Sequence, residues 1–91
     1  MHAVVVRLHI DPERGDEAEM MLHQAVVPTT RQAPGFVSAT WLRGTDGATG
    51  LSIELFESEE AARAFAENAQ TPPGSPATIE SVEVMEVVVT A

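Results

Sequence analysis

The chain has 91 residues, with 14 acidic and five basic side chains, a formal net charge of -9 and no cysteine. This length accommodates one domain, residues 1–91, with a modest core. The charge argues against nucleic-acid binding, which needs Lys and Arg to neutralise phosphates. The missing cysteines exclude disulfides, thiolate zinc sites and iron–sulfur clusters, and fit a cytoplasmic protein. No apolar run reaches the ~20 residues of a membrane span, and we expect no signal peptide.

The first half of the chain predicts a strand and then a helix. Residues 3–10 are rich in β-branched side chains and too few for a core helix, which favours a strand. Asp11 and Pro12 are typical of a helix start, and Asp16 offers a later one. Pro28 is expected to kink the helix or loosen its backbone bonding, and residues 33–35 end it. The apolar stripe of this helix is predicted to contain Ala18, Met21, Leu22, Ala25, Val26 and Thr29.

The second half predicts a hairpin, a helix and a last strand. Residues 36–43 and 51–57 read as strands joined by a glycine-containing turn over residues 44–50. Ser58 is the expected N-cap of the second helix, with acidic residues in its first turn. Residues 71–76 contain three prolines and form either a plain connector or a lid, and residues 80–90 are the fourth predicted strand. The apolar stripe of the second helix contains Ala61, Ala62, Phe65 and Ala69.

The element order β-α-β-β-α-β predicts an α+β, ferredoxin-like fold, with a four-stranded antiparallel sheet and two helices on one face. The other face would be apolar and uncovered, which soluble monomers rarely tolerate. Two copies stacked sheet against sheet would bury this face, so we expect a homodimer. The apolar residues behind this expectation are Ala3 and Val5, Leu51, Ile53 and Leu55, and the alternating set Val82, Val84, Met85, Val87, Val88 and Val89.

Two stretches resemble antibiotic-biosynthesis-monooxygenase-like domains. Residues 28–36, PTTRQAPGF, are similar to the junction between the first helix and the second strand of that family. Residues 51–61, LSIELFESEEA, are similar to its third strand and the start of its second helix. Each stretch helps to make a turn or a cap and neither is catalytic. The likeness in element order spans nearly the whole chain. The resemblance implies a dimeric α+β barrel with a pocket between helices and sheet in each subunit.

The same resemblance covers several activities. Members of the family that the chain resembles include oxygenases that oxidise phenolic substrates without metal or flavin, haem-degrading enzymes, and proteins of no known activity. Haem-degrading members use an Asn on the first strand, a Trp late on the third strand and a later His. Those strand positions fall on Val6 and Phe56 here, and the histidines His2, His9 and His23 all precede the second helix. The haem-degrading pattern is therefore missing, and no cofactor is expected.

Glu54 is the main candidate for catalysis. It lies in the middle of an apolar strand and shares a face with Phe56, which we place on the helix side. A buried carboxyl group there would have a raised pKa and could act as a general base. The alternative is that Glu54 stays in contact with water. Trp41, Phe56, Phe65 and Val6 are the candidate walls of a substrate pocket, although a single Trp on a strand is more often packing.

Other candidate sites have less support. Arg7 and His9 share a face of the first strand, where they could bind an anionic group or pair with acidic residues at an interface. No spacing of His with carboxylates matches a known metal motif, so no metal is expected. Two hypotheses remain open. One is a cofactor-independent oxygenase acting on an aromatic or polyketide-like substrate, and the other is a non-catalytic dimeric module that binds a small ligand or serves as an accessory domain.

Overall fold

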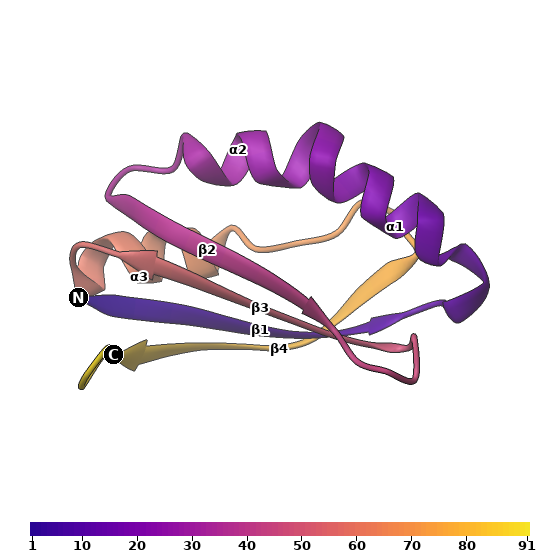
Figure 1. Ribbon diagram of the computed structural model, residues 1–91. Helices are drawn as coiled ribbons and strands as arrows, with labels where there is room; N and C mark the ends of the chain where they lie inside the picture. Colours follow the sequence, from indigo (N-terminus) through magenta and orange to yellow (C-terminus); the bar gives the residue numbers. More distant parts are fainter.

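The computed structural model describes residues 1–91 and has one sheet with helices on one of its faces (Figure 1). The strands are β1 (His2–Ile10), β2 (Phe36–Arg43), β3 (Thr49–Phe56) and β4 (Ala77–Glu86). Their order in the sheet is β2-β3-β1-β4, and every neighbouring pair is antiparallel. This arrangement confirms the predicted ferredoxin-like α+β fold.

Three α-helices lie on the same side of the sheet: α1 (Gly15–Met21), α2 (Val27–Arg31) and α3 (Glu59–Glu67). A 3-10 turn, Pro12–Arg14, precedes α1, and a π-helical turn, Leu22–Val26, joins α1 to α2. Together they form one long helical segment, residues 12–31, which corresponds to the first predicted helix. Asp11 caps its start as predicted, because its carboxylate accepts a hydrogen bond from the Glu13 N–H at 3.0 Å.

The π-helical turn changes which side of the long helical segment faces the sheet. Pro28 has no N–H, and its ring would clash with the carbonyl four residues earlier in a regular helix. The backbone widens just before it, so that the N–H of Val27 donates to the carbonyl of Leu22. The extra residue in this turn rotates the helix face. Thr30 is therefore buried, whereas Ala25 and Thr29, predicted for the apolar stripe, are exposed.

The last strand lies three to four residues earlier than predicted. Residues 80–90 were expected, but β4 already begins at Ala77, which pairs with Ile10 of β1. At the other end Glu86 pairs with His2, where β1 stops. Beyond Glu86 the chain has no strand to pair with. One further hydrogen bond forms there, from the Val87 N–H to the Met1 carbonyl at 3.0 Å. Similarly, β3 begins at Thr49, because Thr49 and Gly50 already pair with β1.

The core lies between α3 and the middle of the sheet. It consists of Val4 and Val6 on β1, Phe56 on β3 and Ala62 on α3, all buried. The small alanines of α3 let it approach the sheet closely, and Phe36 and Phe65 contact Phe56 with ring centroids 6.2 Å and 5.1 Å away. Ser58 caps α3 as predicted, because its hydroxyl oxygen accepts a hydrogen bond from the Ala61 N–H at 3.1 Å.

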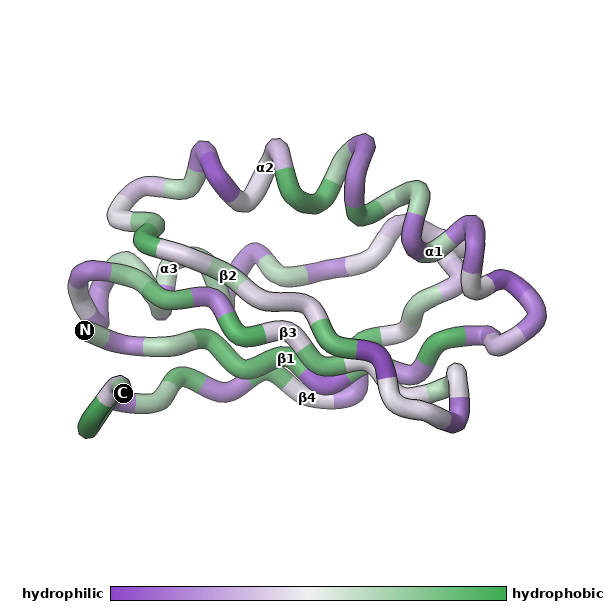
Figure 2. The backbone as a smooth tube through the Cα atoms, viewed as in Figure 1, coloured by the Kyte–Doolittle hydropathy of each residue, from purple (hydrophilic) through white to green (hydrophobic).

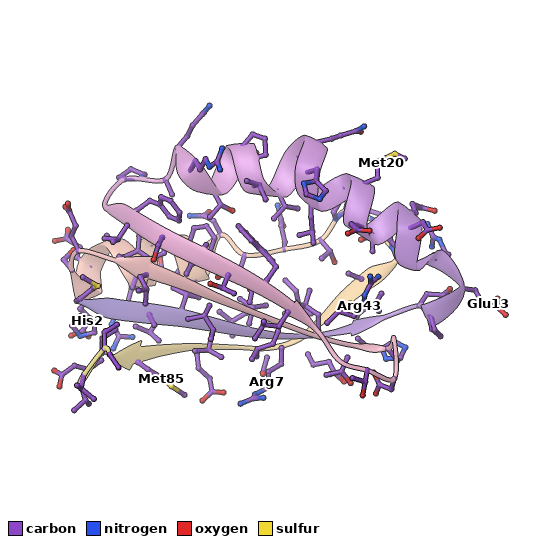
Figure 3. The ribbon with its side chains drawn as sticks, in the orientation of Figure 1. His2, Arg7, Glu13, Met20, Arg43 and Met85 are labelled. Carbon is purple, nitrogen blue, oxygen red and sulfur yellow. The ribbon has the colours of Figure 1, made fainter.

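The face of the sheet opposite the helices carries a central group of apolar side chains with a polar border. Strand alternation and the pairing registers place Val5, Leu51, Ile53, Leu55 and Met85 on this open face. Arg7 and Met85 point away from the helices in Figure 3. Figure 2 shows hydrophobic residues along β1 and β3 at the centre of the sheet. No helix of the chain is both long enough and apolar enough to cross a membrane.

Candidate functional site

A cavity of about 400 Å³ lies between the long helical segment and the sheet. Its volume falls within the ~300–1,000 Å³ typical of small-molecule sites. The helix-facing side of β1, β2 and β3 forms its floor, the long helical segment its roof, and α3 with the following loop one side. Its lining includes Val6, Glu19, Thr30, Trp41, Arg43, Gly50, Ser52, Glu54, Phe65 and the loop residues Thr71, Pro72, Ser75 and Pro76.

Glu54 is the most unusual residue of the cavity. It lies between Val4 of β1 and Ala39 of β2 on the helix-facing side of the sheet. The residue is only 2% exposed, and its Oε1 atom has no hydrogen-bond partner. Burial raises the pKa of Glu54 to about 7, because the apolar surroundings disfavour the carboxylate. A hydrogen bond from the Ser52 hydroxyl lowers the pKa but does not offset the burial.

The next row of side chains on the helix-facing side contains a hydroxyl group and the only tryptophan. Ser52 pairs with Val6 on one side and with Trp41 on the other, so these three side chains lie across the cavity floor. Trp41 is half-buried. The floor therefore offers a flat aromatic wall and a hydroxyl group beside a titratable carboxyl group. This combination can hold a planar ring and accept a proton from it.

Four of the predicted pocket residues come together at this cavity: Val6, Trp41, Glu54 and Phe65. Phe56 does not line it. Phe56 is 0% exposed and fills the core under α3, because its strand position pairs with Phe36 and His2 at the end of the sheet away from the cavity.

Arg7 and His9 are exposed on the open face, far from the cavity floor by strand alternation. Arg7 pairs with Glu83 of its own chain, Nε to Oε1, at 3.9 Å. His2 lies beside Glu59, with 3.6 Å between Nε2 and Oε1, and His23 is exposed on the long helical segment. No imidazole lines the cavity, and no group of three His, Asp or Glu side chains is arranged to hold a metal ion.

Thr30 and Arg43 are among the cavity residues that were not predicted from the sequence. Thr30 is buried against the cavity only because the π-helical turn rotates the helix face. Arg43, at the end of β2, lines the cavity as its only cationic residue. Its strand position provided a signal, since residues 41 and 43 share a face and Trp41 was already a pocket candidate.

Comparison with known proteins places this geometry in a family. Residues 1–71 match the family model described as antibiotic biosynthesis monooxygenase. The chain belongs to the antibiotic biosynthesis monooxygenase family. The matched region contains β1, β2, β3, the long helical segment and α3, whereas the cavity residues Ala77 and Ile79 of β4 lie beyond it. No curated protein sequence is significantly similar to the chain.

Solved structures of low sequence identity share the fold. MhuD from Mycobacterium tuberculosis, a haem-degrader with two haems in its active site, is 24% identical with a TM-score of 0.76, covering 100% of this chain and 99% of MhuD. SnoaB, a cofactor-independent oxygenase from Streptomyces nogalater, is 19% identical with a TM-score of 0.66. The match covers 98% of this chain and 94% of SnoaB. A monooxygenase from Streptomyces coelicolor with bound nanaomycin D is 20% identical with a TM-score of 0.60. The match covers 99% of this chain and 92% of the monooxygenase.

Proposed function

We propose that this family member is a cofactor-independent oxygenase that acts on an aromatic or polyketide-like substrate. The observation that carries the proposal is Glu54, a buried carboxyl group with a free oxygen on the floor of an apolar cavity. A pKa of about 7 suits a general base at neutral pH, because a useful fraction is deprotonated and the carboxylate is a strong proton acceptor. The family match and the likeness to SnoaB support this reaction class.

The chemistry needs a substrate that becomes electron-rich when it loses a proton. In an anthrone-like substrate, Glu54 would take a proton from the CH2 group between two rings, leaving a carbanion. The carbanion would donate electrons to O2 and form a C–O bond, giving a peroxide that takes the proton back from Glu54. Cleavage of the O–O bond then yields a ketone and water, so that CH2 and O2 become C=O and H2O. The apolar cavity would exclude bulk water from these steps.

Haem degradation, which MhuD performs, does not fit the cavity residues. Haem iron is held by His, Cys, Tyr or Met ligands. The cavity lining contains no His, Cys or Tyr. Its one thioether belongs to Met21 on the roof, and no second residue of an iron-binding type lines the cavity with it. The strand position expected to carry an Asn in haem-degrading members is Val6, an apolar floor residue.

Oxygen consumption tests the proposal. Wild-type protein with an anthrone or a hydroquinone should consume O2 faster than the buffer, and the rate should rise with pH around pH 7 as Glu54 loses its proton. The Glu54→Gln variant should lose most of the added rate, about 10²-fold or more for a general base. Glu60→Gln, an exposed acid on α3, is the matched control and should keep it. Binding of the aromatic compound without O2 consumption would favour the non-catalytic ligand-binding module.

We also propose that the chain forms a homodimer through the open face of its sheet. Val5 and Ile53 lie at the centre of this face as direct cross-strand partners, flanked by Leu55 and Met85. Exposed apolar patches of this kind usually mark an interaction site. A second sheet stacked on this face would bury the apolar centre and leave the Arg7–Glu83 pair at its border. The cavity lies on the other side of the sheet and would stay open to ligand.

A further inference from the structure

We propose that Arg43 binds a carboxylate group of the ligand and so selects acidic aromatic compounds. This inference rests on the proposed function to the extent that the cavity must bind an aromatic molecule. Arg43 is the last residue of β2 and lines the cavity from the same face as Trp41. In Figure 3 its side chain rises from the sheet toward the start of α1.

The guanidinium of Arg43 has no acidic partner, although the chain carries a net charge of -9. Three of the other four arginines form ion pairs: Arg7 with Glu83, Arg14 with Glu17, and Arg63 with Glu59. The only hydrogen bond of the Arg43 side chain is a long one, from Nη1 to the Gly15 carbonyl at 3.5 Å. Most of its five N–H donors are therefore free for a ligand.

The nearest acid along the chain is already engaged elsewhere. Asp46 accepts hydrogen bonds from the backbone N–H groups of Ala48 and Thr49 and from the Thr49 hydroxyl, at 2.9–3.0 Å. These bonds hold the pKa of Asp46 below its usual value, so it stays ionised within the hairpin turn. Glu19 lines the cavity as well but forms no ion pair with Arg43.

Two glycines lie near the Arg43 side chain. A Cβ atom on Gly15 would lie 3.1 Å from Nη1 of Arg43, so the start of α1 lies close against the guanidinium. Gly50 is the cross-strand partner of Arg43 and lines the cavity beside it. A Cβ atom on Gly50 would lie 3.0 Å from Ile10 Cδ1. The side chain of Ile10 therefore occupies the space above Gly50, and this part of the floor next to Arg43 is apolar.

The chemistry that fits this corner is a carboxylate attached to an aromatic ring. A planar guanidinium forms two parallel hydrogen bonds to a carboxylate, and such charge-assisted bonds are stronger than neutral ones. Trp41, two residues earlier on the same face, would contact the ring of the ligand. The other charged groups of the lining, Glu19 and Glu54, would repel an anion or hold it away from the floor. Arg43 is therefore the one point at which the cavity can attract an anionic ligand.

Paired ligands test the assignment. We would measure binding of 6-hydroxy-2-naphthoate and 2-naphthol by isothermal titration calorimetry at pH 7.5, where only the first is charged. Wild-type protein should bind the naphthoate about tenfold more tightly than the naphthol, the factor that ~1.4 kcal/mol gives. Arg43→Gln should abolish this preference without weakening the naphthol, and Arg43→Lys should retain part of it. Arg31→Gln, an exposed arginine outside the cavity lining, is the matched control and should behave as wild type.

The variants also separate this inference from the proposed reaction. Glu54→Gln should keep the preference for the naphthoate, even if it consumes no O2. Equal weakening of both ligands in Arg43→Gln would show that Arg43 only supports the structure, and an unchanged preference would show that it does not contact the carboxylate. Either result overturns the inference and leaves the oxygenase proposal standing. If the wild type binds neither ligand, the Arg43 inference and the oxygenase proposal are both overturned.

Discussion

Glu54 takes its properties from its neighbours in the sheet. On the helix-facing side, the adjacent strands place Val4 and Ala39 beside it, and neither can donate a hydrogen bond from its side chain. The carboxyl group therefore loses water without gaining a cationic partner, which favours its neutral form. The same isolation makes the anion a stronger base when it does form.

Glu54 is expected to make the free energy of unfolding of the protein depend on pH. The raised pKa of about 7 means that the native state holds a proton which the unfolded chain, with a pKa of 4.5, has already released. The contribution of Glu54 to the free energy of unfolding is fully present below pH 4.5. It falls as the pH rises toward 7, by a total of about 3 kcal/mol. Urea unfolding of wild type and Glu54→Gln from pH 4 to pH 8 should show this loss in the wild type only. Parallel curves for the two proteins would contradict the burial of an unpaired carboxyl group.

Strand alternation was enough to predict the facing of Glu54, because residues 54 and 56 share a face whatever the exact ends of β3. It was not enough to separate Phe56 from the cavity, since both lie on the helix-facing side. That separation depends on where α3 and the long helical segment sit along the sheet. Arg43 was missed because a charged residue at the end of an edge strand is typical of a solvated terminus. Its side chain is in fact exposed, and only the fold shows that it also lines the cavity.

The long helical segment illustrates how an element can be predicted while its face is not. The start at Asp11 and the disturbance at Pro28 follow from local chemistry. A π-helical turn adds a residue without any pattern of its own, so the period of the stripe could not reveal it. Thr30 instead of Thr29 faces the cavity for this reason.

The loop over residues 71–76 closes one side of the cavity and is held by the start of the helical segment. Nη2 of Arg14 donates to the Gly74 carbonyl at 2.9 Å, and the Asp11 N–H donates to the Pro76 carbonyl at 2.8 Å. Arg14→Ala should loosen this loop, because only one of the two links remains. Amide hydrogen exchange at Gly74 and Ser75 should become several-fold faster in the variant, as local opening becomes easier. Unchanged exchange would show that Arg14 does not restrain the loop.

The junction between the long helical segment and β2 depends on one glycine. Gly35 has a φ of 79°, and a Cβ atom there would lie 2.7 Å from the Ala61 Cβ atom. Gly35→Ala should therefore destabilise the protein by about 1–3 kcal/mol, because it combines backbone strain with a clash against α3. Thermal unfolding measures the change, with Gly74→Ala as the control: Gly74 also has a positive φ, but a Cβ atom there meets nothing within 4 Å. Equal losses in both variants would show that the clash contributes nothing.

At the scale of the whole molecule, the sheet has one face covered by helices and one face that is apolar and open. The covered face holds the cavity, and the open face holds the proposed dimer contact. The sequence predicted both faces, because alternation of side chains fixes them together. The volume of the cavity was not predictable, since it depends on how far the long helical segment stands from the sheet.

The dimer is tested by sedimentation. Wild-type protein should sediment as a dimer at micromolar concentration, and Ile53→Lys should shift it to a monomer, because a charge at the centre of the contact cannot be paired. Met20→Lys makes the same kind of change on the outer surface, where Met20 is 57% exposed and points away from the sheet (Figure 3), and should leave the dimer intact. A wild-type monomer whose sedimentation does not change with concentration would refute the pairing.

The central claim is that Glu54 is a buried proton acceptor on the cavity floor. The most direct measurement is the titration of its side-chain carboxyl carbon by NMR in protein labelled with ¹³C-glutamate, assigned by its absence from Glu54→Gln. A midpoint near the pKa of about 7 is predicted. A midpoint near the ordinary glutamate value of 4.5 would place Glu54 in contact with water and contradict its role as the base.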